Sequence, residues 1–341
     1  MFISRDGAVL KMHMSLTRNC LTNKNFSYFT YSREALIEIL KFNKISSDDE
    51  IVLPNYLCST VVECILPITK NIKYYTISDS LSYSKLEVSG LITKKTRLII
   101  FVDYFGIETK VDKDLELKLK NNKIILVKDS AHSFLSLVNR NFSKDYNYDY
   151  LISSVYKNIP LQVGSIAIGR FSESYNFINS AILIKRYIVL FLKNIICFFG
   201  QDRFINKNIQ NISISSNIPV NYSYSFNAVR FYQKILFHVN FEKIIAEKKD
   251  LASIFNKFFS NNLIYKPLFS QEIMDQNILQ VYPIIFKNKV QRDVVLSLLN
   301  KNCIDTYTWP TFHKANCNDF LWSRILLLPL NIKVIKTLQD V

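Results

Sequence analysis

Between residue 30 and about residue 170, hydrophobic positions alternate between helical and strand spacing. Stretches with the spacing of an amphipathic helix are REALIEILKF (33–42), CSTVVECILP (58–67) and LELKLKNN (115–122). Short apolar runs typical of strands are EIVLP (50–54), NIKYYTI (71–77), TRLIIFVDYFG (96–106), KIILVKDS (123–130) and DYLISSV (149–155), which precedes GSIAIG (164–169). This alternation predicts an α/β domain built on a largely parallel sheet.

The rest of the chain has a different pattern. Residues 181 to about 262 are mostly helical in spacing, and the last part has the mixed pattern of a small α+β unit. The elements of that unit are VYPIIFK (281–287), QRDVVLSLLNKNCI (291–304) and a final helix after Pro329. We therefore predict a large domain over residues 1–225 and a small C-terminal domain over 226–341. No Gly/Ser-rich linker marks the boundary.

Composition describes a folded protein with a basic surface. Of the 341 residues, 49% are hydrophobic and 21% are charged, and the formal net charge is +15. Such a chain can bury a sizeable core, which argues against intrinsic disorder. The lysines are spread without runs of like charge, and no zinc-finger spacing or aromatic-basic RNA motif is present. The charge favours a phosphorylated small molecule, and we expect no nucleic-acid partner and no metal site.

The cysteines and the N-terminal stretch predict a reduced, cytoplasmic protein. None of the six cysteines forms a CxxC pair, and MFISRDGAVLKM lacks the charged-then-apolar order of a cleaved signal peptide. One strongly apolar stretch, 181–200, is interrupted by Lys185, Arg186 and Lys193, which disfavours a membrane-spanning helix. We expect this helix to pack within a dimer or against the large domain, with peripheral membrane attachment as the alternative.

Chemically useful side chains follow four of the predicted segments. In open α/β sheets ligands bind at the carboxyl ends of the strands, so the residues just after each apolar run are candidates. These are KDSAH (128–132), Lys157, PNYLC (54–58) and YSR (31–33), which begins a helix. A lysine, an aspartate and a helix N-terminus match the needs of pyridoxal phosphate. The lysine forms an imine with the aldehyde, the aspartate keeps the pyridine nitrogen protonated, and the helix N-terminus holds the phosphate.

Taken singly, these residues have simpler explanations. Lys157 could be a solvated loop charge, Asp129 a turn or helix-cap residue, and His132 a satisfied half-buried group. Arg33 is a first-turn cation that the helix dipole disfavours, and a bound phosphate would account for it. The order and spacing of the set favour the functional interpretation.

Other conspicuous side chains are interpreted as packing residues. Cys58 and Cys64 lie six residues apart on a predicted helix, where cysteine is more often part of the core than a ligand. Trp309 and Trp322 are likewise assigned to packing.

Several short motifs make the chain resemble the DegT/DnrJ/EryC1/StrS family of pyridoxal-phosphate-dependent sugar aminotransferases, over about residues 30–335. The matching stretches are YSREAL (31–36) for SGRxAL, LPNYLC (53–58) for LPAYxC, DYFG (103–106) for H-[LY]-[YF]-G, VKDSAHSF (127–134) for EDxAHS, SVYKNIP (154–160) for SLRKxxP, VNYSYS (220–225) for NYRxS, TWP (308–310) for a small-domain motif and LLLPL (326–330) for LLSLP. The resemblance implies an aspartate-aminotransferase type of fold (fold type I), with a large mostly parallel-sheet domain and a small α+β domain.

The resemblance also implies roles for ten residues. Lys157 would form the imine and move a proton, and Asp129 would pair with the ring nitrogen. His132 would contact the ring hydroxyl, and Cys58, with Tyr56 beside it, would stand where many members stack an aromatic residue. The phosphate would be held by Ser154, by the backbone of Ser32, Arg33 and Glu34, and by Asn221 of the partner subunit in a homodimer.

Several positions depart from the motifs, and four of them are singled out. Ser32 replaces Gly, Lys128 replaces Glu, Ser223 replaces Arg, and Ser165 interrupts the Gly-Gly that usually follows the lysine loop. Most of these changes affect the phosphate site rather than the Lys157 and Asp129 pair.

The resemblance implies transfer of an amino group, usually from glutamate, to a keto sugar carried on a nucleotide, as in the assembly of surface polysaccharides such as O-antigen. Two alternatives remain open at this point. One is a non-catalytic relative that acts as a binding or scaffold protein, and the altered phosphate site favours it. The other is a pyridoxal-phosphate enzyme of another reaction type; the dehydratases of the family have histidine where Lys157 stands, which argues against that branch.

Overall fold

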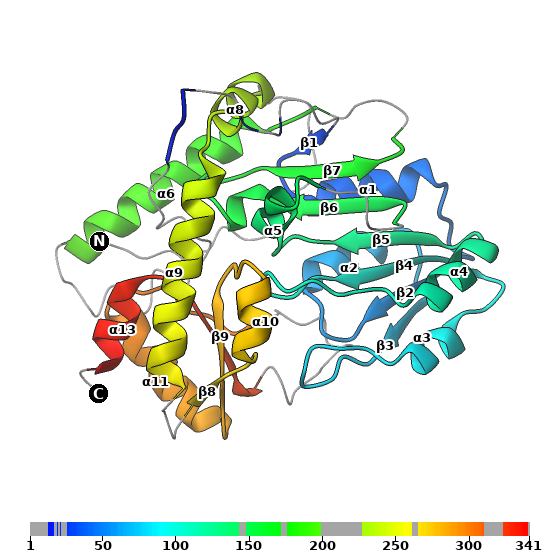
Figure 1. The fold of residues 1–341 in the computed structure, drawn as a ribbon. Helices are drawn as coiled ribbons and strands as arrows, with labels where there is room; N and C mark the ends of the chain where they lie inside the picture. The colour runs from blue at the N-terminus through cyan, green and yellow to red at the C-terminus, as the bar shows by residue number, and fades with distance from the viewer. Residues whose placement is uncertain are drawn as a thin grey trace.

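The computed structural model describes residues 13–16, 19, 21, 26–142, 148–171, 176–198, 227–260, 265–309 and 323–339. They form a seven-stranded sheet with helices packed on it, and a smaller three-stranded sheet with its own helices (Figure 1). The structure therefore has the predicted combination of a large α/β part and a small α+β part.

The larger sheet has the strand order β1-β7-β6-β5-β4-β2-β3. Its strands are β1 (Ser27–Phe29), β2 (Glu50–Pro54), β3 (Ile72–Tyr75), β4 (Thr96–Val102), β5 (Ile125–Asp129), β6 (Tyr150–Ser154) and β7 (Ser165–Gly169). Strands β6, β5, β4, β2 and β3 pair in parallel, whereas β7 pairs antiparallel with both β6 and β1. The sheet is therefore largely parallel, as predicted.

Helices from the connections between strands pack on the sheet (Figure 1). They are α1 (Ser32–Phe42), α2 (Ser59–Ile65), α3 (Lys85–Leu91), α4 (Lys113–Asn121) and α5 (Phe134–Asn139). The buried positions of α1 include Ala35, Leu36, Ile39 and Leu40, and this spacing forms one apolar face that rests on β6 and β7. The sequence pattern thus places the N-terminus of α1 next to the ends of those strands.

The C-terminal half contains long helices and the small antiparallel sheet, whose order is β10-β9-β8. The helices are α6 (Ser180–Phe198), α8 (Val229–Leu236), α9 (Phe241–Phe259), α10 (Gln271–Gln276), α11 (Lys289–Lys301) and α13 (Ile332–Gln339). The strands are β8 (Tyr265–Pro267), β9 (Tyr282–Phe286) and β10 (Ile325–Leu328).

Helix α9 links the two parts of the structure. In Figure 1 it runs past both the larger sheet and the small sheet. Phe241 and Ile244, near its N-terminus, lie in the hydrophobic core shared with α5 and β6. Phe255 and Phe259, near its C-terminus, lie in a second core that includes residues of both the larger sheet and the small sheet. The small sheet is therefore joined to the larger one by continuous apolar packing.

The longer predicted elements are confirmed, and the omissions are short. Elements of three to seven residues that the spacing does not predict are β1, α3, α5, β8 and α10. The domain boundary at residue 225 stays a prediction, because 199–226 lie outside the described residues. The expectation of an entirely reduced chain is wrong at Cys303, which is disulfide-bonded.

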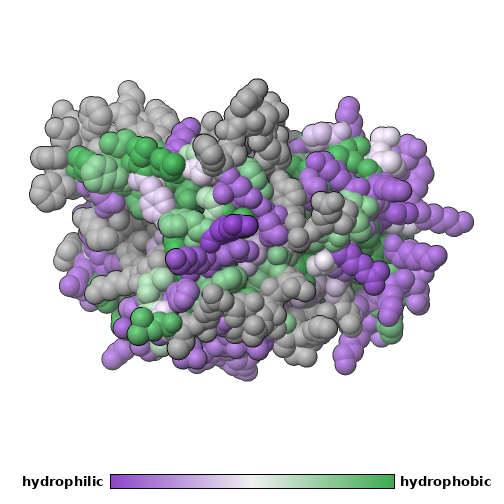
Figure 2. Space-filling view, turned by 90° about the horizontal axis from the view of Figure 1, so that it is seen from above, coloured by the Kyte–Doolittle hydropathy of each residue, from purple (hydrophilic) through white to green (hydrophobic). Residues whose placement is uncertain are grey.

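Helix α6 presents an apolar stripe to solvent. Its exposed apolar side chains are Ile184, Tyr187, Ile188, Phe191, Leu192 and Ile195. They recur every three to four residues, so they lie on one side of the helix, and Figure 2 shows apolar side chains gathered at the left, where α6 lies. Arg186 faces the protein instead and donates to the carbonyl of Gln162 at 2.9 Å. Within the described part of the chain, no helix is both long and apolar enough to cross a membrane.

A tight turn after β4 brings the two parts of the structure into contact. Phe105 and Gly106 have φ of 58° and 105°, and the Ile107 N–H donates to the Tyr104 carbonyl at 2.8 Å. Positive φ at both central residues is typical of a type I′ turn, and glycine accepts it without strain. A Cβ on Gly106 would lie 2.2 Å from the carbonyl oxygen of Ile278.

Replacing Gly106 with alanine should therefore lower the free energy of unfolding by at least about 1–3 kcal/mol, because backbone strain and a clash act together. Urea denaturation measures the change. The matched control is Gly90→Ala in α3, where an added Cβ meets nothing within 4 Å; it should be neutral or stabilising by up to about 1 kcal/mol. Equal effects of the two substitutions would contradict the described turn.

Candidate functional site

A pocket lies at the carboxyl ends of β2, β4, β5 and β6, beside the N-terminus of α1. Seven of the ten predicted site residues line it: Ser32, Arg33, Cys58, Asp129, His132, Ser154 and Lys157. These residues come from segments far apart in the sequence, and the parallel strands bring them together at one edge of the sheet.

Lys157 and His132 form the first contact within the pocket. Lys157 ends the 3₁₀ turn η2 (Val155–Lys157) that follows β6, and its Nζ lies 3.1 Å from Nε2 of His132. The Phe105 N–H donates to Nδ1 of His132 at 3.4 Å. Burial, with a smaller contribution from Lys157, holds the pKa of His132 well below its ordinary value. The ring is therefore neutral at physiological pH.

The aromatic surroundings of His132 fix its orientation. Its ring stacks on Phe105 with centroids 5.7 Å apart and planes at 13°, and the edge of Trp309 packs against it at 5.0 Å. The stacked Phe105 belongs to the turn in which both central residues have positive φ. The strained turn thus positions the histidine that contacts Lys157.

Asp129 is the last residue of β5 and is only 7% exposed. One carboxylate oxygen accepts the Ala131 N–H at 3.0 Å. Burial raises the pKa of Asp129 to about 6, although the charge of Lys157 and the Ala131 N–H act in the opposite direction. At neutral pH the carboxyl is ionised but responsive to neighbouring charges, as a partner for a cationic ring nitrogen must be.

Three serine hydroxyls meet at the N-terminus of α1. The Ser32 Oγ lies 2.6 Å from the Ser154 Oγ and 2.8 Å from the Ser165 Oγ, which donates to the Ser153 carbonyl at 2.8 Å. The first N–H groups of a helix have no intrahelical acceptor, and the helix dipole favours an anion there. Hydroxyls and N–H groups together can hold a phosphate. Two of the departures from the family motifs, Ser32 and Ser165, are therefore in contact with each other.

Cations and aromatic rings lie next to these hydroxyls. Arg33 lies over the Tyr31 ring at 4.5 Å, and Arg186 of α6 lies 5.2 Å from the Tyr31 ring and 5.0 Å from the Tyr156 ring. Tyr31, Arg33 and Tyr156 line the pocket. The positive charge at this end of the pocket suits an anionic ligand.

Three predicted site residues are not part of the lining. Tyr56 is fully buried and its hydroxyl donates to the Trp309 carbonyl at 2.6 Å. The Glu34 N–H already donates to the Tyr31 carbonyl at 3.1 Å, and the Glu34 carboxylate accepts the Thr30 N–H at 3.0 Å. Asn221 lies outside the described residues. Cys58 does line the pocket, where the Thr60 hydroxyl donates to its sulfur at 3.3 Å.

The structure adds residues that sequence reasoning missed. Trp309, interpreted above as a packing residue, is buried and also lines the pocket. Its place in the TWP motif (308–310) was the available signal. Asp103 also lines the pocket; it lies within the predicted strand 96–106 but directly follows the observed strand β4 (Thr96–Val102), at the edge of the sheet where ligands bind.

Comparison with known proteins supports the resemblance. The model of the DegT/DnrJ/EryC1/StrS aminotransferase family matches residues 28–141, a segment that contains Asp129 and His132. Over this segment the match supports the motif-based resemblance to pyridoxal-phosphate-dependent aminotransferases. No curated protein matches the chain.

Solved structures confirm the fold across nearly the whole chain. The aminotransferase PseC of Helicobacter pylori, involved in the biosynthesis of pseudoaminic acid, is 15% identical with a TM-score of 0.61, covering 100% of this chain and 98% of PseC. A DegT/DnrJ/EryC1/StrS aminotransferase of Brucella abortus is 14% identical with a TM-score of 0.60, covering 94% and 86% of the two chains. NtdA of Bacillus subtilis, with bound cofactor PMP, is 12% identical with a TM-score of 0.61, covering 94% and 73%.

The raised pKa of Asp129 predicts a pH-dependent stability of the cofactor-free protein. Between the unfolded pKa, about 3.9, and the folded value of about 6, the folded state binds more protons than the unfolded state. The free energy of unfolding should therefore fall as pH rises through this window, by about 3 kcal/mol from Asp129. Chemical denaturation at a series of pH values measures it. Asp129→Asn should remove this part of the fall, and parallel curves for the two proteins would show that Asp129 does not titrate there.

Proposed function

We propose that this chain, as a member of the DegT/DnrJ/EryC1/StrS family, uses pyridoxal phosphate to transfer an amino group, from glutamate, to a nucleotide-linked keto sugar. The observation that carries the proposal is the convergence of the Lys157 amine, the Asp129 carboxylate and the serine hydroxyls at the N-terminus of α1 in one pocket. These three sets of groups would bind the aldehyde, the ring nitrogen and the phosphate of the cofactor, respectively.

The donor groups fit pyridoxal phosphate. Ser32 and Ser154 would donate hydrogen bonds to the phosphate at the helix N-terminus, Asp129 would pair with the ring nitrogen, and Lys157 would bind the aldehyde carbon covalently. When bound, the cofactor supplies an electron sink that stabilises negative charge on the carbon of the donor. The pocket therefore offers one suitable partner for each of the three polar groups of pyridoxal phosphate: its phosphate, its ring nitrogen and its aldehyde.

The side chains then have distinct tasks. Lys157 would hold the aldehyde and, with its amine free, would serve as the base that moves a proton of the donor. Asp129 would keep the ring nitrogen cationic. His132 is neutral and lies 3.1 Å from Lys157, so it orients the lysine without adding a competing charge. We also propose that Cys58 and Trp309 bound the space beside the ring, since both line the pocket.

Several observations support a nucleotide-linked sugar as the acceptor. The chain carries a net charge of +15, and Arg33 stands at the pocket without an ion pair among the described residues. A diphosphate between nucleotide and sugar is an anion of the kind that such a surface attracts. A protein of Streptococcus pneumoniae that shares the fold is described as a putative sugar aminotransferase. We place the reaction in the cytoplasm and in the assembly of surface polysaccharides, such as O-antigen.

The non-catalytic alternative is less well supported. It rests on the departures at the phosphate site, yet Ser32 and Ser165 contribute hydroxyls that hydrogen-bond each other and add polar groups to the cradle. A pyridoxal-phosphate enzyme of another reaction type would use the same lysine and aspartate. The products formed from glutamate distinguish transamination from another pyridoxal-phosphate reaction, because we expect 2-oxoglutarate only from transamination.

Lys157→Ala should abolish both the visible absorbance of protein mixed with pyridoxal phosphate and the transamination activity, because Lys157 is the one amine among the described residues that line the pocket. Far-UV circular dichroism should be unchanged. The matched control is Lys120→Ala on the exposed face of α4, which should retain colour and activity. A colourless wild-type protein would favour a scaffold, and a Lys157→Ala protein that still transaminates would refute the role of Lys157.

We further propose that the protein is a homodimer and that the partner subunit covers the apolar stripe of α6. Family resemblance places Asn221 of the partner subunit at the phosphate, so the site would be completed on dimerisation. Leaving the stripe exposed would cost apolar burial, whereas insertion across a bilayer is opposed by Lys185, Arg186 and Lys193.

Sedimentation of protein purified without detergent should give a dimer. Ile188→Asp with Phe191→Asp should shift it to a monomer and weaken cofactor binding, since both side chains are more than half exposed on the stripe. Val290→Asp on α11, 73% exposed, is the control and should leave the dimer intact. Wild-type protein that stays with membranes until salt or detergent is added would instead indicate peripheral attachment.

A further inference from the structure

The pocket that Asp129 lines contains a second buried carboxyl, that of Asp103. Asp103 directly follows β4, the neighbour of β5, and its N–H donates to the Asp129 carbonyl at 2.9 Å. Both residues line the pocket, and their exposed fractions are only 2% and 7%. Two carboxylates that line one buried pocket repel each other, so keeping both ionised requires a cation held nearby.

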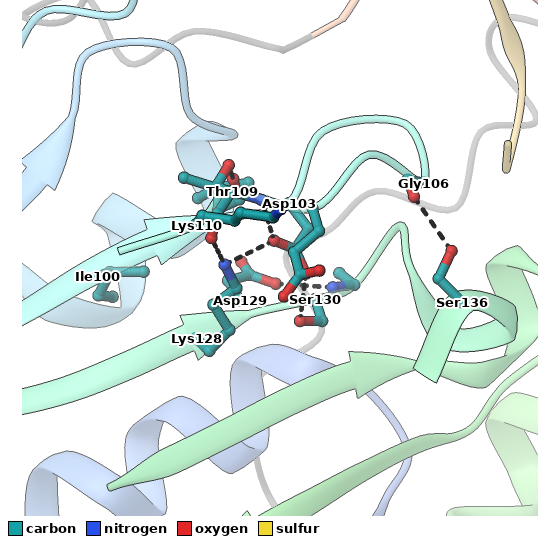
Figure 3. Close-up of polar contacts among 12 residues, drawn as sticks. Ile100, Asp103, Gly106, Thr109, Lys110, Lys128, Asp129, Ser130 and Ser136 are labelled. Carbon is teal, nitrogen blue, oxygen red and sulfur yellow. Dashed lines mark hydrogen bonds and ion pairs between the residues drawn. The ribbon is translucent and has the colours of Figure 1, made fainter. Parts of the chain in front are cut away.

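Lys128 supplies that cation. It precedes Asp129 on β5, so its side chain leaves the strand on the other face, and its Nζ lies 2.8 Å from Oδ1 of Asp103 (Figure 3). The same Nζ donates to the Thr109 carbonyl, and Lys128 is only 4% exposed. A buried ion pair of this kind is stable only when the remaining hydrogen-bonding positions are also filled.

The carboxylate of Asp103 meets that condition. Oδ1 also accepts the Thr109 N–H at 2.8 Å, and Oδ2 accepts the Ser130 hydroxyl at 2.6 Å. Figure 3 shows these groups converging on Asp103 from the turn after β4 and from the end of β5. The Asp103 carboxylate is therefore held in one position by Lys128, Thr109 and Ser130.

The charges around Asp129 can now be assigned. Lys157, from η2, and Asp103, at the end of β4, both act electrostatically on Asp129, and the un-ionised Tyr104 also lies within range of its charge. Lys157 is committed to chemistry, so its charge is not permanently available to Asp129. Lys128 is the cation that remains in place throughout. Positions 103 and 128 both differ from the family motifs, which have His and Glu there, and the two replacements carry complementary charges.

We propose that Lys128 and Asp103 form a positioning pair for Asp129: Lys128 neutralises Asp103 and thereby allows Asp129 to remain ionised at neutral pH for a cationic group of the ligand. The cationic group is the ring nitrogen of pyridoxal phosphate, and this assignment rests on the proposed function. Without Lys128, the two carboxyls share a proton, and Asp129 loses part of its charge. This loss of charge is consistent with the effects of the neighbouring groups on the pKa of Asp129, which Asp103 raises and Lys157 lowers.

Lys128→Met tests the pair, because methionine keeps the length of the side chain and removes its charge. The affinity for pyridoxal phosphate is measured by titration across a series of pH values. In wild type the affinity should fall with decreasing pH as Asp129 is protonated. Lys128→Met should move the midpoint upward by about one to three pH units. Lys128→Arg, which keeps the charge, and the double variant Asp103→Asn/Lys128→Met, which removes both charges, should return it close to the wild-type value.

A purely structural role predicts a different result. Lys128→Met would then lower the melting temperature and leave the midpoint unchanged, and this outcome would overturn the proposal. If Lys128→Met does not fold, Asp103→Asn decides, because it removes the neighbouring anion while Lys128 stays charged. Its midpoint should move downward, and an unchanged midpoint would refute the pair.

The cofactor-free protein provides an independent readout. The free energy of unfolding of Lys128→Met should keep falling with rising pH beyond the wild-type window, because the folded state retains a proton shared between the two carboxyls. The double variant should not show this extension. Protein that binds no pyridoxal phosphate would refute the proposed function, whereas the presence or absence of the extension would still decide whether the pair controls ionisation.

Discussion

A carboxyl group buried as deeply as that of Asp129 keeps its negative charge only where cations and N–H groups are held against it, and much of the surrounding structure meets this requirement. The Ala131 N–H comes from the loop after β5, and Lys157 comes from the 3₁₀ turn after β6. Lys128 acts through Asp103 at the end of β4. The ionisation of Asp129 therefore depends on residues that follow three adjacent parallel strands, whose carboxyl ends meet at one edge of the sheet.

The departures from the family motifs form connected sets. Ser32 and Ser165 hydrogen-bond to each other, and Ser32 also contacts Ser154. Asp103 and Lys128 form a buried ion pair. In each set one replacement provides the hydrogen-bonding or charge partner of the other, so neither leaves a buried polar group unpaired. Such coupling is expected where the site is maintained in altered form rather than lost.

Much of the fold could be predicted from spacing, and the reason is visible in particular elements. Helix α1 and strand β4 bury long apolar faces, so their periodicity is unambiguous. Strand β1 and helix α10 have only three and six residues, too few to establish a period. The site residues that follow strands, such as Asp129 and Lys157, could be found because the sheet is parallel.

Other features depend on contacts between distant parts of the chain. Trp309 reaches the pocket from beyond the small-sheet strand β9, and no local pattern specifies that it packs on His132. Tyr56 is next to Leu57 and Cys58, which line the pocket, yet its hydroxyl is bonded to the Trp309 carbonyl. The partnership of Asp103 with Lys128 likewise follows from the pairing of β4 with β5, which the order of segments along the chain does not determine.

The central claim is that Lys157 binds the cofactor covalently, and chemical trapping tests it most directly. Reduction of the protein with borohydride in the presence of pyridoxal phosphate converts an imine into a stable amine, and peptide mass spectrometry then locates the pyridoxyl group. We expect a single modified peptide that carries the group on Lys157. A protein that remains unmodified, or one in which the group is found on surface lysines and not on Lys157, would contradict the account.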